Sequence, residues 1–182
     1  MLDLETMGTR PGALLLSIGA VRFDPYAPFD PTAPDETKFE RFHVGITMES
    51  CTLFDLTIEP GTLQWWMHTD RRSAWEELEM LEKVDLPTAL DAFSQWLGQT
   101  PFDAIWGNSA SFDCGLLLAA YQKVGLDAPW KFWHERCYRT LRSLAPQVAI
   151  PQTAGTAHNA LADAIREAAH TQAIYRWYRF AR

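Results

Sequence analysis

The first quarter of the chain carries the alternating apolar and polar positions and the short apolar runs that are typical of β-strands. Strands are expected over residues 1–8, 13–23 and 38–46. A loop that contains four prolines, residues 24–37, lies between the second and third strands. Gly19 inside the second strand indicates a bulge or a close approach of another backbone. Short connections favour an antiparallel meander for these three strands.

Beyond residue 60 the apolar positions recur mainly at helical spacing. Helices are expected over residues 61–67, 71–81, 87–98 and 114–125, from 140, and from 159 onward, with strands near 102–106 and 136–138. Pro87 suits a first helical residue, and Gly98 and Gly125 suit helix ends. The element order predicts a single α/β domain over residues 1–182, in which helices cover a mixed sheet.

Composition and charge narrow the class of protein. The chain has 182 residues with 47% hydrophobic and 13% aromatic residues, which is typical of a globular protein. The net charge of −7 counts against simple binding to a nucleic-acid backbone and fits a protein whose acids are covered by metal ions. Three cysteines without a CxxC pair indicate a reducing compartment and argue against zinc. No membrane span or signal peptide is visible, so a cytoplasmic location is expected.

The first strand carries the main candidate chemistry. Leu2 and Leu4 point to one face, while Asp3 and Glu5 point to the other and lie roughly 6.5–7 Å apart. Two like charges at this distance disfavour each other's ionisation, and a cation that neutralises both removes the penalty. Oxygen ligands suit a hard divalent ion, magnesium or manganese. The alternative for this pair alone is an exposed strand with solvated acids.

A second acidic position follows the expected strand at 102–106. The segment from Trp106 to Asp113 runs from a strand end into a helix start, so Asp113 lies at the carboxyl end of a parallel strand. Sheets of this class bind ligands at that edge. Taken alone, Asp113 is more simply an acid favoured by a helix dipole.

The third position pairs His158 with Asp163. Five residues on one helix separate two side chains by about 140°, so the two converge only if His158 lies on the loop before the helix. A histidine on a mobile loop suits a general base that enters the site with substrate. A surface histidine near a helix start is the alternative.

Together these blocks resemble a known family. The sequences DLET, Asn-x-x-x-Phe-Asp and His-x-x-x-x-Asp occur in the order found in the DEDDh 3′–5′ exonucleases of the RNase H-like superfamily. The forms DLETMG, WGNSASFD and RCYRTLR, with the TLQWW stretch, are most similar to the phage and bacterial branch that includes the mycobacterial exoribonuclease-like domain. The resemblance implies a five-stranded mixed sheet, a three-strand antiparallel meander plus two parallel strands, flanked by helices.

The resemblance also implies the chemistry. The four carboxylates would hold two Mg²⁺ or Mn²⁺ ions, and His158 would act as the general base in releasing nucleoside 5′-monophosphates from single-stranded 3′ ends of RNA or DNA. The metal ligands implied are Asp3, Glu5, Asp113 and Asp163. The residues expected to contact substrate are Thr6, Met7, Trp66, Asn108 and Phe112.

Two alternatives stay open. An RNase H-like module that binds nucleic acid without cutting it is disfavoured because all five reactive positions are present. A phosphodiesterase of short oligonucleotides would use the same chemistry and differ only in substrate length. A homodimer is compatible with the sequence. Each of the 8 tryptophans could stack on a base or pack in the core, and core packing is the more common role.

Overall fold

The computed structural model describes residues 1–27 and 39–180. Its elements are β1 (Leu2–Thr6), β2 (Leu15–Arg22), β3 (Glu40–Ile46), α1 (Met48–Leu53), α2 (Pro60–Trp66), η2 (Thr69–Arg71), α3 (Arg72–Met80), β4 (Lys83–Val84), α4 (Leu86–Gly98), β5 (Ile105–Gly107), α5 (Asp113–Val124), η3 (Phe132–His134), β6 (Glu135–Cys137), α6 (Tyr138–Ser143) and α7 (Ala160–Tyr178). Most of the expected loop at 24–37, and the first residue of the expected third strand, lie outside the described residues.

The strands form two hydrogen-bonded groups. One sheet has the order β1-β2-β3-β4, in which the first three strands are antiparallel and β4 runs parallel to β3. The antiparallel meander is therefore confirmed. Strands β5 and β6 are parallel, as expected, but they pair only with each other among the described residues. The prediction of one five-stranded mixed sheet is wrong, while the mixed α/β class is confirmed.

The physical reasons for this difference are local. Strand β4 has two residues, too few to display an alternating pattern in the sequence. Strand β5 lies near β1, yet the backbone N–H of Leu4 faces the Asp113 carboxylate and lowers its pKa. In a continuous sheet the Leu4 N–H would donate to a backbone carbonyl of β5. Here it faces the Asp113 side chain instead, so β1 and β5 do not pair at this position.

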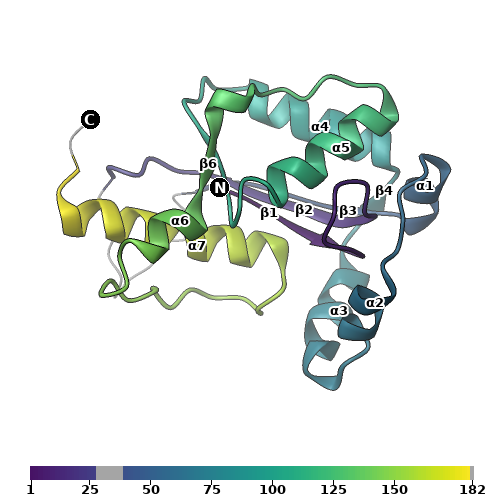
Figure 1. Ribbon diagram of the computed structural model, residues 1–182, viewed down its shortest axis with the longest axis horizontal. Coiled ribbons are helices and arrows are strands. Elements are labelled where there is room, and N and C mark those ends of the chain that lie inside the picture. The colour runs from purple at the N-terminus through teal and green to yellow at the C-terminus, as the bar shows by residue number, and fades with distance from the viewer. Residues whose placement is uncertain (28–38, 181–182) are drawn as a thin grey trace.

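Helices cover the sheet on two sides (Figure 1). Leu2 and Leu4 pack into the larger core with residues of α4 and α5. Ala164, Ile165 and Ala168 of α7 belong to a second core that includes Val21 and Trp106. The predicted alternation of β1 is therefore confirmed: its leucines face α4 and α5, and its two acids lie on the other face, toward α7. The single-domain organisation stays a prediction.

The end of α5 and the start of α7 follow their expected signals, whereas in α4 Pro87 is the second helical residue and Gln99, not Gly98, is the C-cap. Helix α5 ends at Gly125, which has a φ of 78°, and α7 begins after Asn159, whose side chain accepts from the Ala162 N–H at 3.1 Å. Helix α1, strand β4 and the short helix η3 were not predicted, and η2 begins two residues before the helix expected over 71–81. Among the described residues, no helix combines the length and apolar character that crossing a membrane requires.

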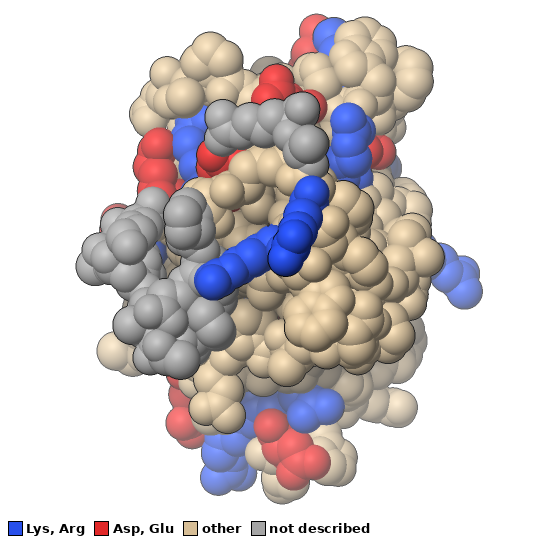
Figure 2. All heavy atoms as spheres, turned by 90° about the vertical axis from the view of Figure 1, so that its left-hand side faces the viewer, with Lys and Arg blue, Asp and Glu red and all other residues tan. Residues whose placement is uncertain are grey.

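The end of the molecule that carries the C-terminal part of α7 is mostly uncharged (Figure 2). Lys and Arg side chains cross the middle of this face, and Asp and Glu lie mainly around its margin. The excess of acidic residues in the sequence is therefore not gathered on this side.

Gly19 marks the point where α7 crosses the sheet. A Cβ atom placed on Gly19 would lie 2.2 Å from the Ala160 carbonyl carbon and 2.3 Å from the Leu161 nitrogen. Distances this short cannot be accommodated by a side-chain movement, because both atoms belong to the backbone. The close backbone approach expected at Gly19 is confirmed, and it sets how near the start of α7 lies to β2.

We expect Gly19→Ala to destabilise the fold by about 1–3 kcal/mol, because the start of α7 must move away from the sheet. Urea unfolding measures this loss. Gly115→Ala in α5 is the matched control, since a Cβ there meets nothing within 4 Å and alanine favours a helix. Equal stabilities for the two variants would contradict the packing argument.

Candidate active site

Strand β1 and helix α7 bring three carboxylates together. One oxygen from each of Asp3, Glu5 and Asp163 lies within 4.8 Å of the other two. Asp3 and Glu5 project from the same face of β1, and Asp163 lies in the first turn of α7. Three convergent carboxylates offer the oxygen-only ligand set that Mg²⁺ and Mn²⁺ prefer. The residues therefore fit a divalent metal ion.

Asp113 lies behind this cluster. Its side chain is 1% exposed, and its Oδ2 atom would be 2.7 Å from a Cβ placed on Gly107, so only glycine at the end of β5 leaves room for it. Oδ2 has no hydrogen-bond partner among the described residues. Asp113 is outside the set of three mutually close oxygens, but its charge raises the pKa of both Asp3 and Glu5.

Burial and mutual repulsion raise the pKa values of these acids. Burial is the main cause in each case: it lifts the pKa of Glu5 to about 8, that of Asp113 to about 7, and that of Asp3 well above its ordinary value. Repulsion from neighbouring carboxylates adds to the rise for Asp3 and Glu5. A bound cation would oppose both effects, so the site is electrostatically incomplete with protein groups alone.

Asp163 is held by two protein groups. One oxygen pairs with the Arg166 guanidinium at 2.6 Å, and the other accepts the backbone N–H of His158 at 3.2 Å. The pair with Arg166 links residues one turn apart on α7. A metal ion at Asp163 would compete with Arg166 for the first of these oxygens.

Glu167 is a fifth acid that the sequence reasoning missed. It is 4% exposed, and its Oε2 atom has no hydrogen-bond partner among the described residues. Burial raises its pKa well above the ordinary value, and the charges of Asp113 and Asp163 add to the rise. The available signal was its position four residues after Asp163, which puts both on one face of α7.

His158 lies on the loop before α7, as the helical geometry required. Its backbone has a φ of 65°, and its imidazole meets the Trp65 ring edge-on with centroids 4.8 Å apart. Burial lowers its pKa, and the positive charge of Arg71 acts in the same direction while Asp163 opposes it. The imidazole is therefore neutral at neutral pH and able to accept a proton.

Glu77 anchors this loop and was also missed. Its carboxylate accepts the Thr156 hydroxyl and the Asn159 amide, the latter at 2.9 Å. Both contacts reach across from α3 to the segment that carries His158. Because they are exposed to solvent, each stabilises the loop only weakly, which is compatible with a loop that opens and closes.

The expected substrate contacts on β1 and α2 lie deeper than the sequence suggested. Met7 and Trp66 are 2% and 5% exposed. The Trp66 indole donates to the Thr6 carbonyl at 2.9 Å, and the Met7 N–H donates to Leu14 at 2.8 Å. In this structure these groups support the end of β1, and a substrate contact stays a prediction for them. The neighbouring Trp65, 37% exposed, offers an accessible aromatic surface beside His158.

The remaining two candidates lie between β5 and α5. Phe112 is half-buried and packs against the larger core. Asn108 is half-buried, and its carbonyl accepts from the Arg139 guanidinium at 2.9 Å. Asn108 therefore connects the carboxylate site to the basic side chains of α6.

Comparison with protein families matches residues 1–175 to the family described as the 3′-5′ exoribonuclease Rv2179c-like domain. The match spans nearly the whole chain and every position of the site described above. No match was found among curated proteins.

We expect the metal-free protein to lose stability as the pH rises from 6.5 to 8. Native Glu5 and Asp113 have pKa values of about 8 and 7 against ordinary values of 4.5 and 3.8, so the native state binds more protons than the unfolded state in this window. The free energy of unfolding then falls with pH. The lowered pKa values of His43, His158, His170 and the Met1 amino group act in the opposite direction, because these groups hold more protons in the unfolded state. The raised pKa values of Asp3 and Glu167 add to those of Glu5 and Asp113, so the four acids determine the sign.

Thermal unfolding in EDTA at several pH values measures this effect. Added Mg²⁺ or Mn²⁺ should raise the Tm most at pH 8, and Asp113→Asn should flatten the pH dependence in EDTA. A metal-free wild type whose Tm is constant or rises between pH 6.5 and 8 would contradict the electrostatic description of the site.

Proposed function

Because the chain belongs to the family of 3′-5′ exoribonuclease Rv2179c-like domains, we propose that it removes nucleotides one at a time from the 3′ end of single-stranded RNA. Family membership makes it a 3′–5′ exonuclease, an enzyme that hydrolyses phosphodiester bonds. The observation that carries the proposal within the structure is the convergence of Asp3, Glu5 and Asp163 beside the buried Asp113. In this proposal the site is of the DEDDh type, with His158 as the histidine.

Asp3, Glu5, Asp113 and Asp163 are the residues that would hold two Mg²⁺ or Mn²⁺ ions. Such ions, when bound, stabilise negative charge on the phosphate and make a bound water more acidic. The raised pKa values of Asp3, Glu5 and Asp113 support this assignment, because buried acids that repel one another gain most from a cation.

The protein groups supply proton transfer and positioning. A water oxygen attacks the last phosphorus while one of its protons passes to an imidazole nitrogen of His158. The bond from phosphorus to the 3′ oxygen breaks and this oxygen takes up a proton from solvent, which gives a nucleoside 5′-monophosphate and a strand with a new 3′ hydroxyl. The Trp65 ring and the bond from the His158 N–H to Asp163 support this role, because they hold the loop beside the carboxylates.

The first test is digestion of matched RNA and DNA oligonucleotides labelled at the 5′ end. Wild type with Mg²⁺ or Mn²⁺ should give a ladder of shortening RNA fragments, which EDTA abolishes. Asp113→Asn should reduce turnover at least about 10²-fold while the protein stays folded, because the amide keeps the shape and loses the charge. Cleavage of circular RNA, or full activity in EDTA, would overturn the proposal. Cleavage confined to very short strands would instead favour a phosphodiesterase of short oligonucleotides.

The second test concerns His158. We expect His158→Ala to lower kcat by about 10²–10⁴-fold and to leave metal affinity measured by calorimetry nearly unchanged. The wild-type rate should rise with pH, with its midpoint below the ordinary histidine pKa of 6.5, because burial lowers the pKa of His158. His68→Ala, at an exposed histidine, is the matched control. A His158 variant with wild-type kcat would remove this residue from the proton transfer.

A further inference from the structure

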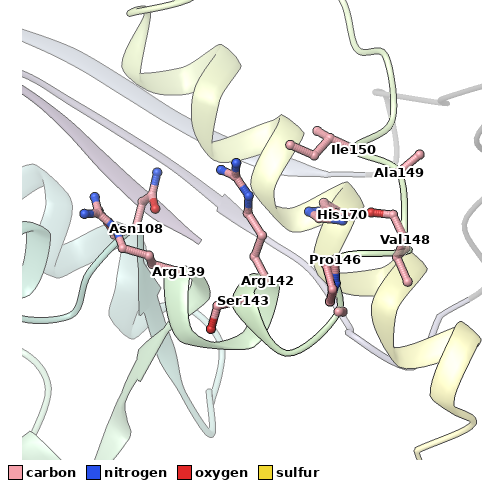
Figure 3. Close-up of a pocket in the computed structure, with 10 residues that line it drawn as sticks. Asn108, Arg139, Arg142, Ser143, Pro146, Val148, Ala149, Ile150 and His170 are labelled. Carbon is pink, nitrogen blue, oxygen red and sulfur yellow. Dashed lines mark hydrogen bonds between the residues drawn. The ribbon is translucent and has the colours of Figure 1, made fainter.

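A cavity of about 720 Å³ opens between α6, α7 and the segment 145–150 that follows α6 (Figure 3). Arg139, Arg142 and Ser143 come from α6, Asn108 follows β5, and His170 belongs to α7. The Arg142 side chain projects from α6 into the space between the two helices. A volume of this size lies in the range of small-molecule and nucleotide sites.

One end of the cavity reaches the carboxylate site. Asn108 directly follows Gly107, the residue that abuts the Asp113 carboxylate. Arg139 donates to the Asn108 carbonyl at 2.9 Å, and its charge lowers the pKa of Asp113 against the larger effect of burial. A strand held at the carboxylates can therefore continue into the cavity.

The wall opposite α6 is held in place by a chain of hydrogen bonds. The Tyr138 hydroxyl lies 2.7 Å from Nδ1 of His170, and Nε2 of His170 lies 3.0 Å from the Val148 carbonyl. A carbonyl can only accept, so Nε2 donates to Val148 and Nδ1 accepts from Tyr138. Tyr178 adds a second tie by donating to the Leu144 carbonyl at 2.9 Å. These bonds fix the segment 145–150 to α7, so the cavity is formed before any ligand binds.

The charge of the cavity comes from its two arginines. His170 is neutral in this arrangement, and burial lowers its pKa. Among the described residues, no ion pair with a carboxylate involves Arg139 or Arg142. Arg142 lies close enough to the Tyr138 hydroxyl for its charge to lower the pKa of that group, although burial raises the value overall to about 12. Arg142 and Arg139 thus form no close ion pair among the described residues, and of the two only Arg139 feels the charge of a site carboxylate, Asp113. Two guanidinium groups free of close ion pairs favour an anionic ligand.

The other lining groups favour a nucleotide over a bare anion. Pro146, Val148 and Ile150 give the cavity an apolar side, opposite the two arginines. A phosphate held by guanidinium groups, with its nucleoside against an apolar wall, uses both kinds of surface. His158 lies against Trp65 of α2 and lines a small cleft together with Glu77 of α3 and Glu5. The terminal nucleotide of the proposed reaction would lie toward these helices.

We propose that this cavity binds the RNA nucleotide immediately 5′ of the scissile bond, with Arg142 and Arg139 on its phosphate. The proposal rests on the proposed exonuclease function and identifies where that site holds the strand that remains after each cleavage. It also explains how a protein with a net negative charge binds RNA, because the guanidinium groups of Arg139 and Arg142 lie next to the carboxylate site, where the strand is held.

Fluorescence anisotropy with a single-stranded RNA octamer in EDTA tests binding without cleavage. Arg142→Gln should weaken binding about tenfold and make the slope of log K against log salt shallower by about 0.7, the value for one phosphate on a single strand. Arg142→Lys should recover most of the slope. Lys123→Gln removes the same charge at an exposed position on α5 and should stay within about twofold of wild type. Thermal unfolding confirms that each variant is folded.

A neutral methylphosphonate linkage locates the contact. Placed immediately 5′ of the last linkage, it should weaken wild-type binding by about the same factor as Arg142→Gln and should add nothing to that variant. Equal RNA affinities of Arg142→Gln and Lys123→Gln would overturn the cavity assignment, and so would fully additive effects of Arg142→Gln and the neutral linkage. Cleavage of RNA by the wild type would still uphold the exonuclease function in either case. If RNA binding depends on Arg142 but the wild type does not cleave RNA, the cavity assignment would be upheld and the exonuclease function overturned.

Discussion

Burial of a cluster of carboxylates is the constraint on which this structure depends. Asp3, Glu5, Asp113 and Glu167 all have raised pKa values because the fold removes them from water, and the charges of neighbouring carboxylates add to the rise for Asp3, Glu5 and Glu167. Such a cluster opposes folding unless protons or cations neutralise it. The elements that carry the acids must therefore be fixed by other contacts: the leucines of β1 in the larger core, and the alanine-rich face of α7 in the second.

The part of the site that depends on local geometry was predictable from the sequence. Alternation along β1 put Asp3 and Glu5 on one face, and helical geometry required His158 to precede α7. The sequence also predicted that Asp113 follows a strand and begins a helix, which is confirmed, although the buried position of its carboxylate against Gly107 depends on a tertiary contact. Glu167 and Glu77 were missed because one is defined by burial and the other by a contact between α3 and a distant loop.

In the fold, too, features set by local sequence were predictable and features set by tertiary contacts were not. The meander and the long helices α4, α5 and α7 have enough residues to display their period, and α5 and α7 carry clear terminal signals. Strand β4 has only two residues, and the number of strands in the sheet depends on which backbone groups meet across the edge of β1. Burial of Met7 and Trp66 likewise follows from packing between β1 and α2, which no local pattern records.

The contact between Gly19 and the start of α7 has a consequence for how the chain can vary in length. The backbone at Ala160 and Leu161 is pressed against β2, and Asn159 fixes the first turn through its bond to Ala162. Each residue added or removed between this contact and Asp163 would turn the carboxylate by about 100° around the helix axis. Insertions in the segment 151–157 do not change the direction in which Asp163 points from α7. This loop can therefore vary in length, whereas residues 158–163 cannot.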